Sequence, residues 1–327
     1  MKKVIVLTTG GTIAMKFDSA SGGLIPAVSG DDLIEAVPAL KNIAQVEVVE
    51  FSNVPSGHVT PAMMHQLAQR VDAYAAQEDV DGITITHGTD TMEETAYMLS
   101  LACTTTKPVT ITGAMRGASD MGYEGPGNIL AAVRVAACAE AGGRGALLVM
   151  NDEIHAAAEV TKTHTVSCST FASPWAGPVG HVYYDGVCFS RASENLEKLP
   201  APKCTKEVLL LKVYAGMDDY LFKCAVAKDV DGLVVEAVGC GNVPPAVMEG
   251  LAYVRSHNIP VVLASRTFAG RVAPVYGYLG SAGSMANLGL LYAGGLSGLK
   301  ARLKLMLALE MAHSEAELAQ YFQEKVY

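Results

Sequence analysis

Short runs of β-branched and apolar residues alternate with longer segments of helical periodicity through the first half of the chain. The apolar runs predict strands at residues 4–8, 46–51, 82–86, 109–112 and 146–151. Helix start signals stand between them: Thr60 precedes Pro61, and Gly125-Pro126-Gly127-Asn128 opens an alanine-rich run. This order predicts a doubly wound parallel sheet with helices on both faces.

The pattern changes after residue 171, where prolines and glycines interrupt it. Asp185-Gly186 lies between two alternating runs and predicts a β-hairpin. The polar stretch that follows contains two prolines and is typical of a linker. We therefore expect an N-terminal catalytic domain at 1–190, a linker at 191–206 and a C-terminal domain at 207–327.

A second, shorter alternation fills the C-terminal part. It predicts strands at 208–213, 232–238 and 261–265, and helices at 218–227, 245–256 and 297–312. Ser314-x-x-Glu317 has the spacing of a capping box and predicts one more helix. The fold class expected is α/β, with a larger N-terminal doubly wound domain and a smaller C-terminal α/β domain.

Composition narrows the classes of partner. The 327 residues include 24 basic and 33 acidic side chains, and no basic run is present, which argues against nucleic acid and anionic membranes. No apolar run approaches the roughly 20 residues that span a bilayer, and no cleavable leader is visible. The seven cysteines are odd in number and lack a CxxC pair. We expect a cytoplasmic protein with reduced thiols and a small-molecule substrate.

The candidate chemistry lies where two predicted strands end. The strand at 82–86 runs into His87-Gly88-Thr89-Asp90, and the strand at 4–8 runs into a turn that contains Thr12. Ligands of open α/β sheets bind at the carboxyl ends of the strands, so these turns predict one shared site. The alternative for Thr89 and Asp90 is simple capping of the next helix, for which both residue types are favoured.

Thr12 follows two glycines and precedes a stretch, 16–30, that has three glycines and little periodicity. Such a stretch reads as a mobile loop, so Thr12 is a candidate nucleophile under a lid that excludes water. The alternatives are a capping threonine or a phosphate-binding loop. The turn lacks both the Lys-Ser/Thr ending of a P-loop and the GxGxxG spacing, which argues against phosphate.

Two further residues extend this site. A lysine whose pKa is lowered by burial can act as general base toward a threonine hydroxyl, and Lys162 stands in a Thr-Lys-Thr run. Ser56 follows another strand end and could donate to a substrate carboxylate. The alternatives are a solvated surface lysine and an ordinary turn serine. None of the eight histidines has HxxxH or HExxH spacing, so no metal site is expected.

Taken together, the motifs resemble those of the bacterial-type L-asparaginases. They stand in the same order as in that family and cover essentially the whole chain: TTGGTIA at 8–14, HGTDTMEETA at 87–96, TGAMR at 112–116, VMNDE at 149–153, TKT at 161–163, GCGN at 239–242 and KAR at 300–302. Several motifs in register are far more specific than any one of them.

The resemblance implies an amidohydrolase that converts L-asparagine and water to L-aspartate and ammonia through a threonine acyl intermediate, without a cofactor. Thr12 would be the nucleophile. Thr89, Asp90 and Lys162 would form a second group, with Lys162 as base and Thr89 activating or positioning water. Within the family the order in which the two threonines act has been argued.

The resemblance also implies how substrate is bound. Asp90 would take the α-ammonium and Ser56, followed by Gly57, the α-carboxylate, while backbone N–H groups of Thr89 and Ala114 would form the oxyanion hole. Family members are homo-oligomers, usually tetramers, whose sites lie at an intimate dimer interface to which the C-terminal domain contributes.

The chain departs from the family pattern near the site. The usual loop tyrosine is absent, because Leu24 and Ile25 occupy that stretch and the first tyrosine is Tyr74. Residues 281–284 (SAGS) offer no counterpart to the acidic residue that many partner subunits contribute. Gly57 and His58 replace larger polar and acidic residues. Two alternatives therefore stay open: an amidohydrolase that prefers glutamine or a D-amino-acid amide, and an amino-acid-binding relative with low turnover.

Overall fold

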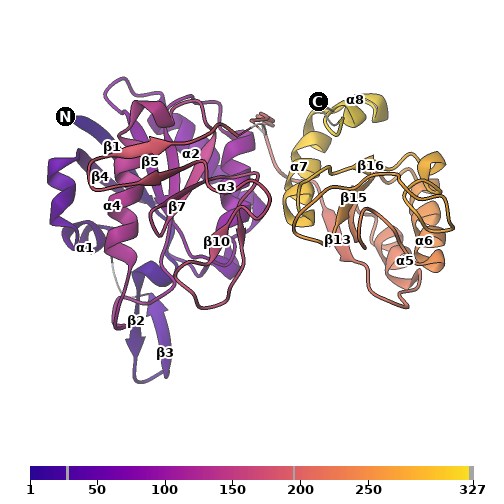
Figure 1. The fold of residues 1–327 in the computed structure, drawn as a ribbon, viewed down its shortest axis with the longest axis horizontal. Coiled ribbons are helices and arrows are strands. Elements are labelled where there is room, and N and C mark those ends of the chain that lie inside the picture. The colour runs from indigo at the N-terminus through magenta and orange to yellow at the C-terminus, as the bar shows by residue number, and fades with distance from the viewer. Residues whose placement is uncertain (27–28, 194–195, 324–327) are drawn as a thin grey trace. The chain divides into compact units, whose positions relative to one another are not determined.

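The computed structural model describes residues 1–26, 29–193 and 196–323, and the chain forms two compact units (Figure 1). Unit 1 is Met1–Pro200 and unit 2 is Ala201–Tyr327. The division falls inside the stretch 191–206. None of the helices in the described ranges is long and apolar enough to cross a membrane.

Unit 1 is built on a sheet whose described strands lie in the order β12-β11-β8-β7-β6-β5-β1-β4. Neighbours from β7 to β4 pair in parallel, whereas β8, β11 and β12 pair antiparallel. The strands are β1 (Lys2–Thr8), β4 (Ala44–Glu50), β5 (Gly82–Thr86), β6 (Val109–Thr112), β7 (Ala146–Met150), β8 (Glu153–Ala156), β11 (Gly180–Val182) and β12 (Val187–Phe189). The chain passes from β1 to β4 on one side and then to β5 on the other, which is the reversal of a doubly wound sheet.

Helices cover both faces of this sheet. On one face α1 (Gly30–Glu35) contacts α4 (Gly125–Ala136), and on the other α2 (Pro61–Ala75) packs against α3 (Met92–Ala102). Ile129 and Val133 of α4 are buried with Val4 and Val6 of β1. The start signal of α2 is confirmed, because the Thr60 hydroxyl accepts a hydrogen bond of 3.3 Å from the Met63 N–H.

The stretch expected to be a loop after Thr12 is in part a hairpin. Strands β2 (Met15–Asp18) and β3 (Gly23–Pro26) pair antiparallel, and they project from unit 1 in Figure 1. Phe17 is 59% exposed and Ile25 40% exposed. Because the hairpin buries no consistent face, its sequence shows none of the apolar alternation that announces a half-buried strand.

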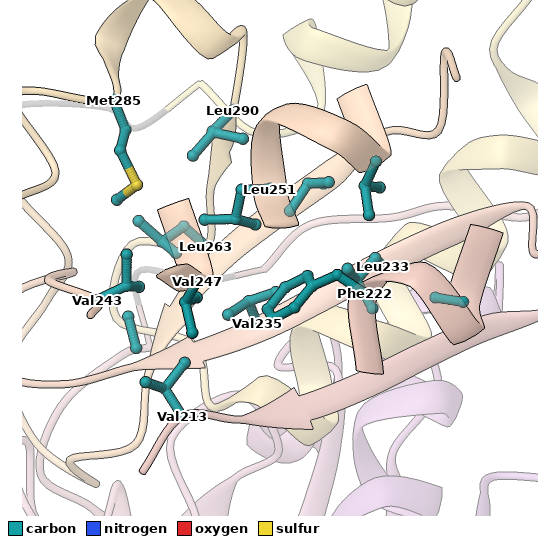
Figure 2. Close-up of a cluster of buried hydrophobic side chains, with 14 of the residues drawn as sticks. Val213, Phe222, Leu233, Val235, Val243, Val247, Leu251, Leu263, Met285 and Leu290 are labelled. Atoms are coloured by element: carbon teal, nitrogen blue, oxygen red, sulfur yellow. The ribbon is translucent and has the colours of Figure 1, made fainter. Parts of the chain in front are cut away.

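Unit 2 contains a parallel sheet in the order β13-β14-β15-β16, with α5 and α6 on one face and α7 on the other. Alternate residues of β14 point to opposite faces of this sheet. Leu233 and Val235 pack in the core with Phe222 (Figure 2), whereas Gly232 lies against Leu305 of α7. The elements are β13 (Val208–Lys212), β14 (Gly232–Ala237), β15 (Val261–Ser265), β16 (Leu291–Tyr292), α5 (Tyr220–Ala227), α6 (Pro245–Ser256), α7 (Gly298–Met311) and α8 (Glu315–Gln320). The expected fold class is confirmed.

The capping box expected before α8 forms only in part. Ser314 Oγ accepts from the Glu317 N–H at 3.1 Å, as predicted. The Glu317 carboxylate, however, accepts from the His313 N–H at 2.8 Å rather than from Ser314 itself. The reciprocal half of the motif therefore falls one residue early.

Candidate active site

Three turns at the carboxyl edge of the parallel strands press together at Gly11, Ser56 and Gly88. Gly11 has φ 84°, and a Cβ on it would lie 2.3 Å from Gly88 Cα. A Cβ on Gly88 would lie 2.9 Å from Ser56 Oγ. No side chain fits at either glycine. The structure thus brings together the turns from which Thr12 and Thr89, the next residues in the chain, project.

Thr89, Asp90 and Lys162 form one hydrogen-bonded group. Lys162 Nζ donates to Thr89 Oγ1 at 2.9 Å and lies 2.7 Å from Asp90 Oδ1. Thr89 is buried, the Lys162 side chain is 14% exposed and the Asp90 side chain is 76% exposed. The lysine is therefore not a solvated surface residue, and it presents its amine between a buried hydroxyl and an accessible carboxylate.

Neither Thr89 nor Asp90 caps the helix that follows. Helix α3 begins at Met92, its N-cap is Thr91, and no side chain makes a cap hydrogen bond there. The Thr91 hydroxyl instead donates to the Ser56 carbonyl at 2.8 Å. The capping alternative is therefore wrong, and Thr89 and Asp90 are available for chemistry.

Lys162 is held by a short piece of antiparallel sheet and by a buried carboxylate. Strand β9 (Thr161–Lys162) pairs with β10 (Phe171–Ala172). Glu93 Oε1 on α3 accepts from the Lys162 backbone N–H at 3.2 Å and from Thr161 Oγ1 at 3.1 Å. Sequence reasoning did not single out Glu93; the only signal was that the first turn of a largely apolar helix carries two acidic residues, Glu93 and Glu94.

Ser56 contacts the backbone of Asp90. It is buried in a 3₁₀ turn, η3 (Ser56–His58), and its Oγ accepts a hydrogen bond of 3.3 Å from the Asp90 N–H. Gly57 and His58 are exposed. Ser56 is a turn residue, as one alternative held. Its hydroxyl also contacts the backbone of Asp90, the residue that follows Thr89.

Thr12 opens the 3₁₀ turn η1 (Thr12–Ala14) and is partly buried. Within the described residues its hydroxyl makes no hydrogen bond. Ala114 is fully buried, and a Cβ on the adjacent Gly113 would lie 3.4 Å from Thr89 Cγ2. The backbone after β6 therefore runs directly beside Thr89, where both Thr89 and Ala114 can offer an N–H.

His87, which precedes Gly88 and Thr89, has a structural role. Its Nδ1 lies 2.7 Å from the Gly88 carbonyl oxygen and its Nε2 3.0 Å from Thr95 Oγ1. A carbonyl can only accept, so Nδ1 bears the proton, and the Thr95 hydroxyl donates to Nε2 of the neutral ring. Burial lowers the pKa of His87 to about 4, against a smaller opposing effect of the bond to Gly88.

Metal ligands do not gather in the described part of the chain. There, no group of three His, Cys, Asp or Glu side chains could hold a metal ion. The seven cysteines are free thiols, of which Cys103 and Cys204 are buried. The polar groups at the strand ends are hydroxyls, a carboxylate and an amine, which suit acyl transfer.

The two departures from the family pattern have different surroundings. Ile25 is 40% exposed on β3, while the side chain of Leu24 lies outside the described residues. In unit 2, Ala282 is 1% exposed and belongs to the hydrophobic core, and Ser281 Oγ donates to the Tyr276 carbonyl at 2.7 Å. Ala282 therefore faces the interior of its own unit.

Comparison with known proteins gives a consistent family. The model of the N-terminal domain of asparaginase matches residues 3–195, and that of the glutaminase/asparaginase C-terminal domain matches residues 207–322. A probable L-asparaginase of Deinococcus radiodurans is 36% identical, with 100% of this chain and 99% of the relative covered. A probable periplasmic L-asparaginase of Haemophilus influenzae is 34% identical over 99% of this chain and 93% of its own.

Solved structures agree. The crystal structure of a probable cytoplasmic L-asparaginase from Campylobacter jejuni superposes with a TM-score of 0.90 at 32% identity, covering 98% of this chain and 99% of that one. Both units, the order of the motifs and the hydroxyl-lined strand ends are thus those of a single family. This chain belongs to the L-asparaginase family of amidohydrolases.

Proposed function

We propose that this protein hydrolyses L-asparagine to L-aspartate and ammonia through an acyl ester on Thr12. The observation that carries the proposal is the contact of Lys162 Nζ with both Thr89 Oγ1 and Asp90 Oδ1, beside the turn of Thr12. An amine, a buried hydroxyl and a second hydroxyl in one place are what nucleophilic attack on an amide needs.

The substrate is oriented by its α-amino and α-carboxyl groups. The exposed carboxylate of Asp90 takes the α-ammonium, and the Ser56 hydroxyl donates to the α-carboxylate. Because Ser56 Oγ already lies 3.3 Å from the Asp90 N–H, the two groups bind neighbouring atoms of one small molecule. The side-chain amide then points toward the two threonines.

In acylation, Thr12 Oγ1 attacks the amide carbon, the hydroxyl proton is transferred to the amide nitrogen, and the carbonyl oxygen becomes an oxyanion. Backbone N–H groups of Thr89 and Ala114 stabilise this charge, because fixed dipoles in a buried site need no reorganisation. Collapse of the intermediate breaks the C–N bond, and the nitrogen leaves as ammonia after taking one proton. An ester of Thr12 remains.

In deacylation, Lys162 acts through Thr89. As the base, Lys162 Nζ accepts the Thr89 hydroxyl proton while Thr89 takes one from water, and the resulting hydroxide attacks the ester. The C–O bond breaks, the proton returns to Thr12 Oγ1, and L-aspartate is released. The 2.9 Å separation of Lys162 Nζ and Thr89 Oγ1 supports this proton path.

Ammonia release from a panel of L- and D-asparagine and L- and D-glutamine tests the proposal. We expect L-asparagine to be the best substrate, with slower turnover of L-glutamine, since one extra methylene is worth only about 1 to 3 kcal/mol of discrimination. A preference for glutamine or a D-amide would replace the substrate assignment. Binding of asparagine without release of ammonia would instead favour the binding relative.

Assembly and location are part of the proposal. We propose a homo-oligomer in which intimate dimers pair into a tetramer, supported by the family resemblance, and a cytoplasmic location. The relatives include a probable cytoplasmic L-asparaginase and a probable periplasmic one. Light scattering of the purified protein and fractionation of expressing cells decide the two points; a monomer or a periplasmic pool would contradict them.

A further inference from the structure

The loop between β6 and α4 is fastened to the segment that follows Thr12. The Tyr123 hydroxyl donates to the Ile13 carbonyl at 2.7 Å. Further along, the Ala118 N–H donates to the Met15 carbonyl at 2.8 Å, and the Phe17 N–H donates to Ser119 Oγ at 2.9 Å. These contacts join two segments about a hundred residues apart in the sequence.

We propose that Tyr123 is a positioning residue that fixes the backbone of the Thr12 turn for attack. The inference rests on the proposed function. Ile13 is the next residue after Thr12, and the turn has two internal hydrogen bonds of its own, from the Ala14 N–H to the Gly11 carbonyl at 2.9 Å and from the Met15 N–H to the Thr12 carbonyl. Within the described residues, the phenol supplies the external hydrogen bond that lies nearest to Thr12 in the sequence, at the carbonyl of the next residue.

The ring of Tyr123 is itself held in place. It packs against the core that contains Ile13, Ala114 and Ile129, and a Cβ on Gly125 would lie 2.4 Å from its Cε2 atom. A glycine at 125 is thus required for the ring to lie there. Burial, and then the Glu124 carboxylate, raise the pKa of Tyr123 to about 12, so the hydroxyl stays a donor at neutral and moderately alkaline pH.

The same loop also contacts the second strand end. The Glu124 carboxylate accepts a hydrogen bond from the Met115 N–H, directly after Ala114. Tyr123 and Glu124 are neighbours, so one short segment fastens both the Thr12 turn and the backbone that offers an oxyanion N–H. A fixed nucleophile and a fixed oxyanion site are the geometry that lowers the barrier to attack.

The test is Tyr123→Phe, which keeps the ring and removes one hydroxyl, with Tyr184→Phe as control because Tyr184 is fully exposed. A misplacement of about 1 Å costs on the order of a hundredfold in rate. Since the Ala118 and Ser119 contacts remain, we expect kcat for L-asparagine to fall roughly tenfold, with KM within about twofold of wild type. Tyr184→Phe should match wild type.

A second readout needs no turnover. An asparagine analogue bearing a diazoketone in place of the side-chain amide should modify Thr12, and Tyr123→Phe should slow that reaction by a factor similar to the fall in kcat. Turnover and modification are both measured well below the unfolding temperature, and the Tm of Tyr123→Phe should differ little from that of wild type. A wild-type kcat in Tyr123→Phe, a rise of KM alone, or an activity loss that tracks a fall in Tm would overturn the proposal.

Failure of the proposed function has a different signature. If wild-type protein releases no ammonia from any amide of the panel, the hydrolase proposal is lost. The rate at which the analogue modifies Thr12 in wild type and in Tyr123→Phe then still decides the role of Tyr123. Equal rates would refute it, and a slower variant would support it.

Discussion

Lys162 and Thr89 meet through an Nζ–Oγ1 hydrogen bond of 2.9 Å across 73 positions of sequence. The contact joins the two-residue strand β9 to the turn after β5. Because the threonine is buried and the lysine side chain nearly so, the bond is protected from competition with water. It makes Thr89 the hydroxyl that the lysine amine already contacts, whereas Thr12 supplies the second hydroxyl from the adjoining turn.

Removing either hydroxyl should stop turnover without unfolding the protein. Thr12→Ala and Thr89→Ala should each lower kcat by at least about a thousandfold, because each group acts in a covalent step. Thr165→Ala is the matched control, since Thr165 is exposed and makes no hydrogen bond within the described residues. Steady-state ammonia release and circular dichroism check the prediction. Near-normal turnover in either variant would show that the substituted threonine is not catalytic.

The order of attack can be settled by trapping the acyl enzyme. Lys162→Met removes the base that would activate water, so an ester formed from L-asparagine should persist. Acid quenching followed by peptide mass spectrometry should find the added mass on the peptide with Thr12. Because Lys162 contacts Thr89 directly, an ester on Thr89 is the result that would reverse the two assignments.

Glu93 should matter through its acceptor oxygen rather than through its charge. Glu93→Gln retains an oxygen for the Lys162 N–H and the Thr161 hydroxyl, whereas Glu93→Ala removes it. Leaving these donors without an acceptor costs about 1 to 3 kcal/mol, so the alanine variant should lose about tenfold in kcat.

The glutamine variant should recover most of that loss, with unfolding by urea measured in parallel on both proteins. Equal kcat in the two variants would argue that the placement of Lys162 does not depend on this oxygen. A fall in stability alone, with kcat unchanged, would leave Glu93 a purely structural residue.

His87 predicts a loss of stability in acid. Its folded pKa of about 4 lies below the ordinary 6.5, so between these values the unfolded chain binds a proton that the folded protein excludes. Stability contributed by the neutral ring is complete above about pH 6.5 and falls as pH is lowered toward about 4, by roughly 3 kcal/mol in total.

The check is urea unfolding at several pH values at fixed protein concentration. His155 is also buried, with a lowered pKa, and adds to the slope in every protein tested. His87→Gln should therefore reduce the slope between about pH 6.5 and 4 rather than abolish it. His58→Gln, at an exposed site, should keep the full slope. An unchanged slope in His87→Gln would show that the ring is not the group responsible.

The sequence by itself determined the elements that have a buried face. Strands β5 and β15 and helix α6 have the predicted bounds, because apolar runs and the proline that opens α6 are local signals that packing leaves unchanged. The hairpin of β2 and β3 was missed for the opposite reason. Phe17 and Ile25 are exposed although both are large and apolar, so apolar alternation does not follow burial there.

The site divides in the same way. Thr12, Thr89 and Asp90 could be named from the sequence, because a polar residue just after a parallel strand lies at the edge where ligands bind. Tertiary structure alone decided three other contacts. These are the hydrogen bonds of Lys162 with Thr89, of Lys162 with Glu93 and of Tyr123 with Ile13. Each joins segments far apart in the chain, and their separation in space is set by how helices and loops pack on the sheet rather than by any local pattern.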